Sequence, residues 1–306
     1  MNWLDAPGSH EARALADVGW VLVAGAFAVF ALTMALLALA LRGRLRAVPA
    51  AWWIAGGGIA VPALVLTALL VYAVARTAGL ERAPAGSPLV VGVTGHLWWW
   101  EVRYHDAASG RWIALANELR LPAGRPVQIG LTSADVIHSF WVPTLGGKMD
   151  LVPGRTNRLV VTAQAEGVHR GVCAEYCGTQ HAKMALHVVV LPPAAFEQWL
   201  AGQATAAAPP AEPIAERGRQ AFLAHGCAGC HAVRGIGGEP VHGGHAQHHA
   251  AVQGAAVHAL LGPDLTHVAS RLHLGAGTLR TDRAAFARWV TGVQDLKPGA
   301  RMPSFD

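Results

Sequence analysis

Four cysteines form two close pairs, and each pair stands beside residues that could bind a metal or a cofactor. Cys173 and Cys177 are followed by His181 and Met184, and a second imidazole, His138, comes earlier. Thiolate, thioether and imidazole together suit copper, whereas zinc usually takes four Cys or His ligands. Two thiolates can each bridge two metal ions, so this set could hold a dinuclear centre. The alternative is a disulfide within the pair, which leaves the two histidines and the methionine unexplained.

The second pair belongs to the run Cys227-Ala-Gly-Cys230-His231. C-x-x-C-H is the attachment signal for c-type haem, in which two thioethers hold the porphyrin and the histidine ligates the iron. Such a run can also occur by chance. Met302 lies downstream and is a suitable second axial ligand. Ligation by histidine and methionine raises the haem potential, which suits an electron carrier.

Two apolar stretches near the N-terminus, residues 18–41 and 52–75, carry no charged side chain. Each would span about 36 Å as a helix, enough to cross the ~30 Å hydrocarbon core of a bilayer. The alternatives are two buried core helices, or a signal peptide and one anchor. Arg42, Arg44 and Arg46 lie between the stretches without an acid. The positive-inside rule therefore predicts a cytoplasmic loop, with both termini on the outer side.

Short β-type runs between Gly and Pro turns follow in residues 88–192, and they predict an antiparallel sandwich or barrel. A helix is expected to follow at residues 194–200. Residues 202–215 are small and Pro-rich, as a linker would be. The next apolar pattern predicts a C-terminal helix over residues 282–293.

These observations predict a multidomain membrane protein. The predicted boundaries are 1–82 for an N-terminal tail and two-helix hairpin, 83–201 for a β domain, 202–215 for a linker and 216–306 for an all-α domain.

The motif C-x3-C-x3-H-x2-M with its upstream histidine resembles the CuA site of subunit II of haem–copper cytochrome c oxidases. The stretches 95–100, 117–122 and 132–157 are similar to the same family, as is the helical hairpin. Residues 262–271 resemble the cytochrome domain fused to subunit II in caa3-type oxidases. The resemblance implies a cupredoxin-like β-barrel followed by a class I cytochrome c domain.

The same resemblance implies a role for each candidate ligand. Cys173 and Cys177 would bridge two coppers. One copper would be completed by His138 and Met184, and the other by His181 and the carbonyl of Glu175. In the family, the side chain at the Glu175 position helps to hold Mg²⁺ at the boundary with subunit I, and a carboxylate suits that hard cation. A solvated acid is the alternative.

The resemblance also makes Trp98 the residue through which electrons reach CuA. Trp98, Trp99 and Trp100 are consecutive. Side chains alternate between the two faces of a strand, so at least one of these indoles should approach a surface. A packing role for Trp98 is the alternative.

The implied function is electron delivery in a caa3-type oxidase, from haem c to CuA and on to subunit I, where O2 is reduced to water and protons are pumped. The implied partners are subunits I and III, an upstream cytochrome c or quinol–cytochrome c reductase, and membrane lipid. The implied location is the bacterial inner membrane. A net charge of +5 without a basic run gives no support for nucleic-acid binding.

Two other functions remain open from the residues. One is the small subunit of a CuA-containing nitric oxide reductase. The other is a membrane-anchored copper store, which would explain a histidine-rich insertion at residues 242–258 but not the haem motif. A surface spacer is the favoured reading of that insertion. The chain also has no acid between Asp17 and Glu81, so the proton-uptake glutamate of many family members has no counterpart there.

Overall fold

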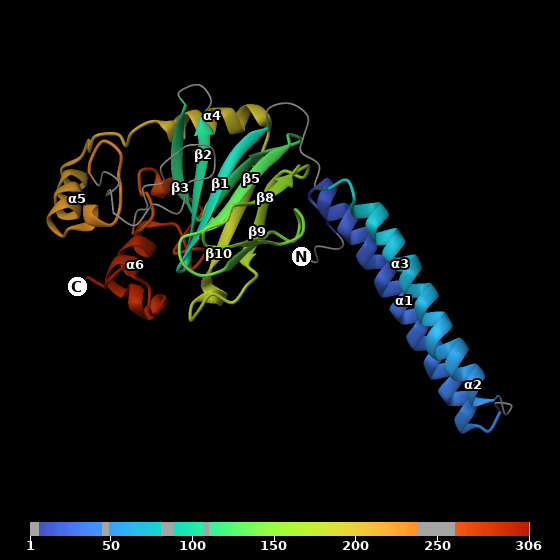
Figure 1. The fold of residues 1–306 in the computed structure, drawn as a ribbon. Helices are drawn as coiled ribbons and strands as arrows, with labels where there is room; N and C mark the ends of the chain where they lie inside the picture. The colour runs from blue at the N-terminus through green and yellow to red at the C-terminus, as the bar shows by residue number, and fades with distance from the viewer. Residues whose placement is uncertain (1–5, 45–48, 81–87, 107–109, 238–260, 306) are drawn as a thin grey trace.

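The computed structural model describes residues 6–44, 49–80, 88–106, 110–237 and 261–305. Three parts follow one another along the chain: a helical hairpin, a domain of two β-sheets and a C-terminal helical part (Figure 1). The histidine-rich insertion, residues 242–258, lies outside the described residues.

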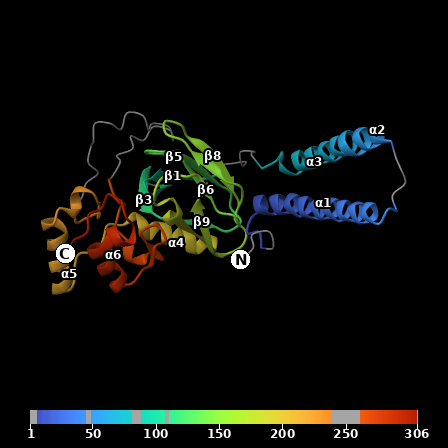
Figure 2. The same cartoon turned by 90° about the horizontal axis from the view of Figure 1, so that it is seen from below.

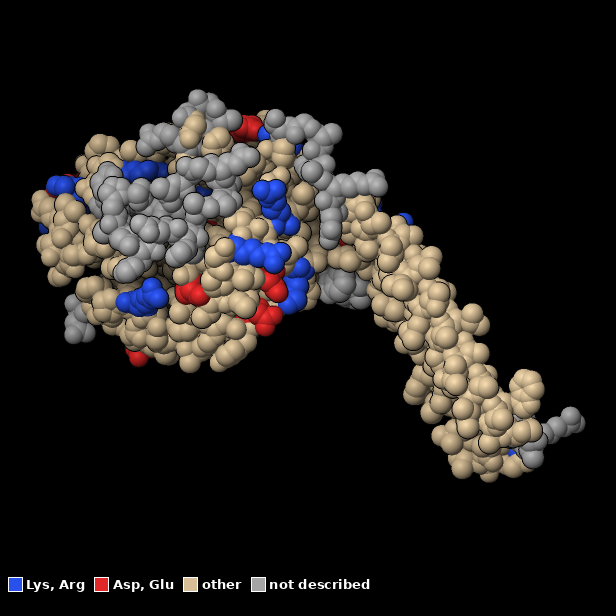
Figure 3. Space-filling view, in the orientation of Figure 1, with Lys and Arg blue, Asp and Glu red and all other residues tan. Residues whose placement is uncertain are grey.

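The hairpin consists of α1 (His10–Leu41), the short α2 (Ala50–Trp52), a π-helical stretch (Trp53–Ala60) and α3 (Val61–Thr77). Its two arms, of 32 and 28 residues, are long and apolar enough to cross a membrane. Pro62 lies inside the second arm, directly after the π-helical stretch, and membrane helices tolerate proline at such positions. The arms extend away from the rest of the protein and show almost no charged side chain on the face in view (Figure 3). The predicted spans 18–41 and 52–75 therefore lie within helices.

The start of α1 is fixed to the β domain. The Ser9 hydroxyl caps the helix by accepting from the Ala12 N–H at 2.9 Å, and it donates to the Leu145 carbonyl at 2.7 Å. The Gly8 N–H donates to the Thr144 carbonyl at 2.6 Å. A side-chain cap of this kind satisfies a backbone donor that the first turn leaves free. The hairpin is thus joined to the domain by polar contacts as well as by the chain itself.

Among the described residues, ten strands form the β domain, in two sheets of five. The first sheet has the order β3-β2-β1-β5-β8, and its strands are β1 (Leu89–His96), β2 (Trp99–Asp106), β3 (Arg111–Ala116), β5 (Val127–Ser133) and β8 (Asn157–Val161). The second has the order β4-β10-β9-β6-β7, with β4 (Glu118–Pro122), β6 (His138–Trp141), β7 (Met149–Leu151), β9 (Gly167–Cys173) and β10 (Ala185–Leu191). Alternate residues of β1, such as Val91 and Val93, are fully buried in the shared core.

The sheets are mixed, which differs from the purely antiparallel sandwich that the sequence predicted. β1 runs parallel to β5, and β10 runs parallel to β4. Between β1 and β5 the chain passes into the second sheet to form β4 and then returns. A parallel pair needs such a long crossover, whereas a tight hairpin can only give an antiparallel one.

The helices after the sheets are α4 (Pro193–Ala204), α5 (Pro213–Ala224) and α6 (Arg283–Leu296). Short turns of 3-10 helix lie at Cys227–Gly229 and Val268–Ser270. β11 (His273–Leu274) and β12 (Leu279–Arg280) form a two-strand ribbon. α4 covers the β domain through Phe196, which is fully buried. α5 and α6 lie at the end of the molecule opposite the hairpin in both views (Figures 1 and 2).

Candidate metal centre

The predicted copper ligands meet at one end of the second sheet. His138 opens β6, Cys173 ends β9, and Met184 directly precedes β10. β9 and β10 are antiparallel neighbours, and the Cys173 N–H donates to the Met184 carbonyl at 3.0 Å, closing the loop between them. β6 pairs with β9, so His138 is carried to the same edge. A 3-10 turn, His181–Lys183, presents the other imidazole.

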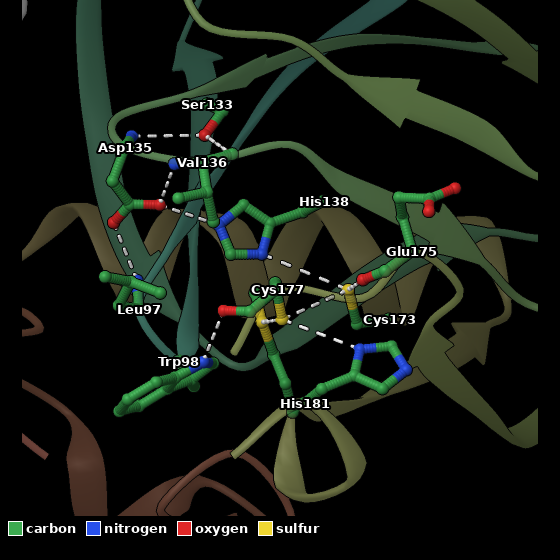
Figure 4. A network of polar contacts seen from close by, with 11 residues as sticks. Leu97, Trp98, Ser133, Asp135, Val136, His138, Cys173, Glu175, Cys177 and His181 are labelled. Carbon is green, nitrogen blue, oxygen red and sulfur yellow. Dashed lines mark hydrogen bonds and ion pairs between the residues drawn. The ribbon is translucent and has the colours of Figure 1, made fainter. Parts of the chain in front are cut away.

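The two thiols form the middle of the site (Figure 4). Their sulfur atoms lie 3.8 Å apart. Cys173 Sγ is 3.9 Å from His138 Nδ1 and 3.2 Å from the Glu175 carbonyl oxygen. Cys177 Sγ is 3.6 Å from His181 Nδ1 and 3.8 Å from Met184 Sδ.

This arrangement is nearly closed to water. The fractional exposure is 0% for His138, 5% for Cys173, 3% for Cys177 and 1% for Met184. Both thiols are free, so the disulfide alternative is absent from the described structure. Among the described residues, His138, Cys173 and Cys177 form the one group of His, Cys, Asp or Glu with ligand atoms within 4.8 Å of one another.

The charges favour a thiolate at this position. The contacts with the Cys177 thiol and with the His138 imidazole lower the pKa of Cys173. The contact between the two thiols raises the pKa of Cys177, because the pair then keeps a single proton. A metal ion binds the deprotonated sulfur, and these contacts favour deprotonation of Cys173 over that of Cys177.

The orientation of His138 is set by its neighbours. Its Nε2 lies 2.8 Å from Asp135 Oδ1, and the other carboxylate oxygen, Oδ2, accepts from the Leu97 N–H at 2.8 Å. Burial disfavours the charged imidazolium, but the hydrogen bonds to Asp135 and Cys173 outweigh it and raise the pKa of His138. A Cβ on Gly95 would lie 2.7 Å from this ring, so the position requires glycine. The Nδ1 atom is thereby turned toward the sulfur atoms.

Two further predicted residues lie at the rim. The Glu175 carboxylate points away from the sulfur atoms and lies 3.3 Å from the Lys148 ammonium (Figure 4). The Trp98 indole donates to the carbonyl of Cys177 at 2.8 Å. The backbone of Gly178 packs closely against the indole, because a Cβ at this position would lie only 3.1 Å from a ring carbon of Trp98. Trp98 therefore contacts the backbone of a thiol ligand.

The C-x-x-C-H residues lie in the C-terminal part, away from the copper ligands. His231 Nδ1 lies 2.8 Å from the Pro263 carbonyl, so this nitrogen carries the proton and donates it, leaving Nε2 free to bind a metal. Burial lowers the pKa of His231, which favours the neutral form that ligates. A Cβ on Gly262 would lie 2.5 Å from the ring. Met302 lies beyond α6, where its carbonyl accepts from Gln294 at 2.6 Å.

The packing of this part suits a large apolar cofactor. The amphipathic helix α5 has no buried residue, and α6 has only two, Ala285 and Val293. Leu223 and Val290 keep 40% and 41% of their surfaces exposed. An amphipathic helix needs an apolar partner for its face, and a porphyrin held by the nearby cysteines would supply one.

Sequence reasoning missed three residues. Asp135 and Pro263 hold the two histidines, but an aspartate or a proline in a loop has no signal of its own. Lys297 is 3% exposed and donates to carbonyls on both sides of the boundary between the β domain and the C-terminal part.

The chain is similar to known proteins over its β domain and beyond it. The profile described as "Cytochrome C oxidase subunit II, periplasmic domain" matches residues 89–191. Cytochrome c oxidase subunit 2 of Alkalihalophilus pseudofirmus is 34% identical over 215 residues, which cover 70% of this chain and 55% of that relative. The chain thus spans little more than half the length of this relative. Subunit 2 of Lycodon semicarinatus is 33% identical over 168 residues, which cover 49% of this chain and 71% of that relative.

Among solved structures, the periplasmic domain of subunit II of cytochrome oxidase from Bradyrhizobium japonicum is 29% identical. The match covers 40% of this chain and 96% of that one, with a TM-score of 0.36. The family match confirms the cupredoxin-like β domain that the sequence predicted. On the strength of the subunit 2 relatives, this chain belongs to the family of cytochrome c oxidase subunit II.

Proposed function

We propose that this chain is the electron-delivering subunit of a caa3-type cytochrome c oxidase, with a dinuclear CuA centre and a covalently attached haem c. The observation that carries the proposal is the pair of buried thiols 3.8 Å apart, with an imidazole against each.

The contacts support bridging thiolates. One proposed copper takes His138 and Met184, and the other takes His181 and the Glu175 carbonyl. Cys173 contacts a ligand of each set, His138 and Glu175. Cys177 likewise contacts a ligand of each set, His181 and Met184. Each sulfur thus lies between the two sets, as a bridging ligand must.

The bound copper pair supplies a one-electron carrier. The protein keeps its ligands fixed, because His138 is held by Asp135 and the thiol loop is closed by backbone hydrogen bonds. Fixed ligands reduce the rearrangement that accompanies a change of charge. Burial also excludes water from the sulfur atoms.

The haem proposal rests on residues of the C-terminal part. Cys227 and Cys230 are free thiols on either side of one 3-10 turn, and His231 follows with its Nε2 unprotonated. Met302 is proposed as the second axial ligand. Trp98 is proposed to receive the electron, because its indole bonds the Cys177 carbonyl.

The hairpin suits a membrane anchor with the β domain outside the cytoplasm. We propose the bacterial inner membrane, with Arg42 and Arg44 on the cytoplasmic side and the chain ends outside. Subunit I is the proposed acceptor and the place of O2 reduction and proton pumping, subunit III a further partner, and a cytochrome c or quinol–cytochrome c reductase the donor. The exposed Glu175 carboxylate, which pairs with Lys148 at 3.3 Å, is proposed to help bind Mg²⁺ at the subunit I boundary.

The function is tested on the purified complex that contains the full chain. We expect it to consume O2 with reduced cytochrome c as the donor, and Met302→Ala to lower the haem potential while the haem stays attached through its cysteines. Consumption of nitric oxide in place of O2 would contradict the oxidase assignment. An unchanged redox titration in the variant would contradict the role of Met302.

A further inference from the structure

Lys297 is a buried amine at the end of α6. Its Nζ donates to three carbonyls: Trp98 at 2.7 Å, Lys183 at 2.9 Å and Gly275 at 3.1 Å. An ammonium has three donors, and here each has its own acceptor. Burial lowers the pKa of Lys297 to about 7, which reflects the cost of placing this charge away from water.

The three acceptors come from three separate segments. Trp98 lies in the turn between β1 and β2, Lys183 in the loop that carries the copper ligands, and Gly275 in the ribbon of the C-terminal part. The amine therefore fastens the C-terminal part to the β domain beside the candidate metal centre. Nothing in the proposed haem or copper chemistry needs this residue.

Neighbouring contacts extend the same junction. We call Leu296–Gly299 the cap segment. Gln180 Nε2 donates to the Pro298 carbonyl at 2.8 Å, and Lys183 Nζ donates to the Leu296 carbonyl at 2.8 Å. A Cβ on Gly299 would lie 3.7 Å from the Trp98 ring. Gly299 of the cap segment thus lies next to the six-membered ring of Trp98, whereas the N–H of the five-membered ring bonds Cys177.

We propose that Lys297 is a positioning residue that holds the cap segment over Trp98, so that the chain's own C-terminal part occupies the electron-receiving face and a separate soluble cytochrome c cannot. The effect on electron delivery rests on the proposed function. The junction, by which we mean the contacts of Lys297 and the cap segment with the β domain, is independent of it. With both groups bound, the haem held by Cys227, Cys230 and His231 would supply one electron, and the copper pair held by the thiol loop would accept it.

The rest of the boundary has its own contacts, so the loss of Lys297 should loosen the cap segment without releasing the C-terminal part. The Leu272 N–H donates to the Glu118 carboxylate at 2.8 Å. The rings of His187 and His273 stack at 4.0 Å, and the Ala185 N–H donates to the Ala276 carbonyl at 3.1 Å.

Hydrogen exchange on the full chain in detergent, at about pH 6 so that the Lys297 ammonium is charged, tests the junction without any need for copper or haem. Lys297→Met keeps the stem of the side chain and removes the amine. We expect exchange to rise roughly tenfold at residues 178–184 and 296–300, since a charged hydrogen bond is worth about one power of ten or more. Residues of β1 and β5 should not change. Arg288→Met, on the exposed side of the same helix, removes an equal charge and should have no effect.

Unchanged hydrogen exchange in a folded Lys297→Met protein would refute the claim that Lys297 holds the cap segment on the β domain. Should that variant fail to fold, Lys183→Met removes the exposed amine that bonds Leu296, and it should raise exchange at the same residues by a smaller factor. No rise in that variant would likewise count against the cap segment.

Electron delivery is measured on the loaded complex by photoreducing haem c and following copper reduction. We expect Lys297→Met to slow this step roughly tenfold and to make direct copper reduction by soluble mitochondrial cytochrome c faster. Faster hydrogen exchange with an unchanged rate of copper reduction would confirm the junction but overturn its role in electron delivery. A chain without copper or haem would overturn the proposed function and leave the exchange result intact.

Discussion

The Trp98 indole donates a hydrogen bond to the carbonyl of Cys177, 2.8 Å away. The backbone carbonyl of Trp98 in turn accepts from the Lys297 amine at 2.7 Å. One residue therefore connects a candidate copper ligand with the C-terminal part of the chain. The indole nitrogen contacts Cys177 and the backbone carbonyl contacts Lys297. A side-chain substitution therefore removes the first contact and keeps the second, which separates an effect on electron transfer from an effect on docking of the C-terminal part.

Trp98→Phe removes the indole N–H and keeps the backbone carbonyl. We expect the copper and haem contents to stay at wild-type values and copper reduction to slow by roughly fivefold, the factor that corresponds to the loss of a hydrogen bond of ~1 kcal/mol from the proposed path. The measurement is flash photoreduction with a metal assay of the same sample.

Trp99→Phe is the matched control, because that ring stacks on His96 at 4.2 Å and has no described hydrogen bond to a thiol residue. Equal slowing in both variants would assign Trp98 to packing, the alternative that the sequence left open.

Asp135→Asn weakens the partner that orients His138. The amide is neutral, so the pKa of His138 should fall and its ring should lose its fixed direction. Substitution of such an outer partner typically costs 10–100-fold in metal affinity, and we expect a copper loss of that order in competition with a chelator. Glu197→Gln, an exposed carboxylate paired with Arg125 at 3.1 Å, serves as the control. Equal affinity in Asp135→Asn and wild type would refute the orienting role.

The stacked rings of His187 and His273 predict a loss of stability in acid. Burial, with the charge of the neighbouring ring, lowers the pKa of His187 to about 4 from its ordinary value near 6.5. The folded chain then binds fewer protons than the unfolded chain between these two values. Stability must therefore fall as pH decreases from about 6.5 to about 4.

Thermal melts of the apo chain across that interval measure the effect. His187→Phe keeps an aromatic ring in the stack and cannot charge, so its melting temperature should fall less with acid than that of wild type. His105→Phe changes a histidine that contacts Trp112 at the sheet edge, and it should behave like wild type. Parallel curves for His187→Phe and wild type would contradict the prediction.

Much of the site was predictable because its chemistry is local in sequence. Cys173, Cys177, His181 and Met184 lie within twelve residues, and His138 was recognised as a second imidazole upstream of them. The apolar spans were equally clear, since composition alone identifies them. The parallel pairing of β1 with β5 was not predictable, because it depends on the crossing of the chain between the sheets.

The junction at Lys297 was also not predictable from the sequence. Its three acceptors are backbone carbonyls, at Trp98, Lys183 and Gly275, and every residue type has such a group. A lysine near a C-terminus is ordinarily read as exposed. Only the relative placement of two domains shows that this one is buried.

The central claim, two bridged coppers beside one haem in the same chain, is tested most directly by metal analysis of the full chain with electron paramagnetic resonance. We predict two coppers for each iron and a mixed-valence dinuclear signal in the oxidised protein. Cys173→Ser should abolish that signal and leave the haem spectrum intact, because the haem depends on Cys227 and Cys230. One copper per iron with the spectrum of a mononuclear blue site, or no copper and a Cys173–Cys177 disulfide, would contradict the account.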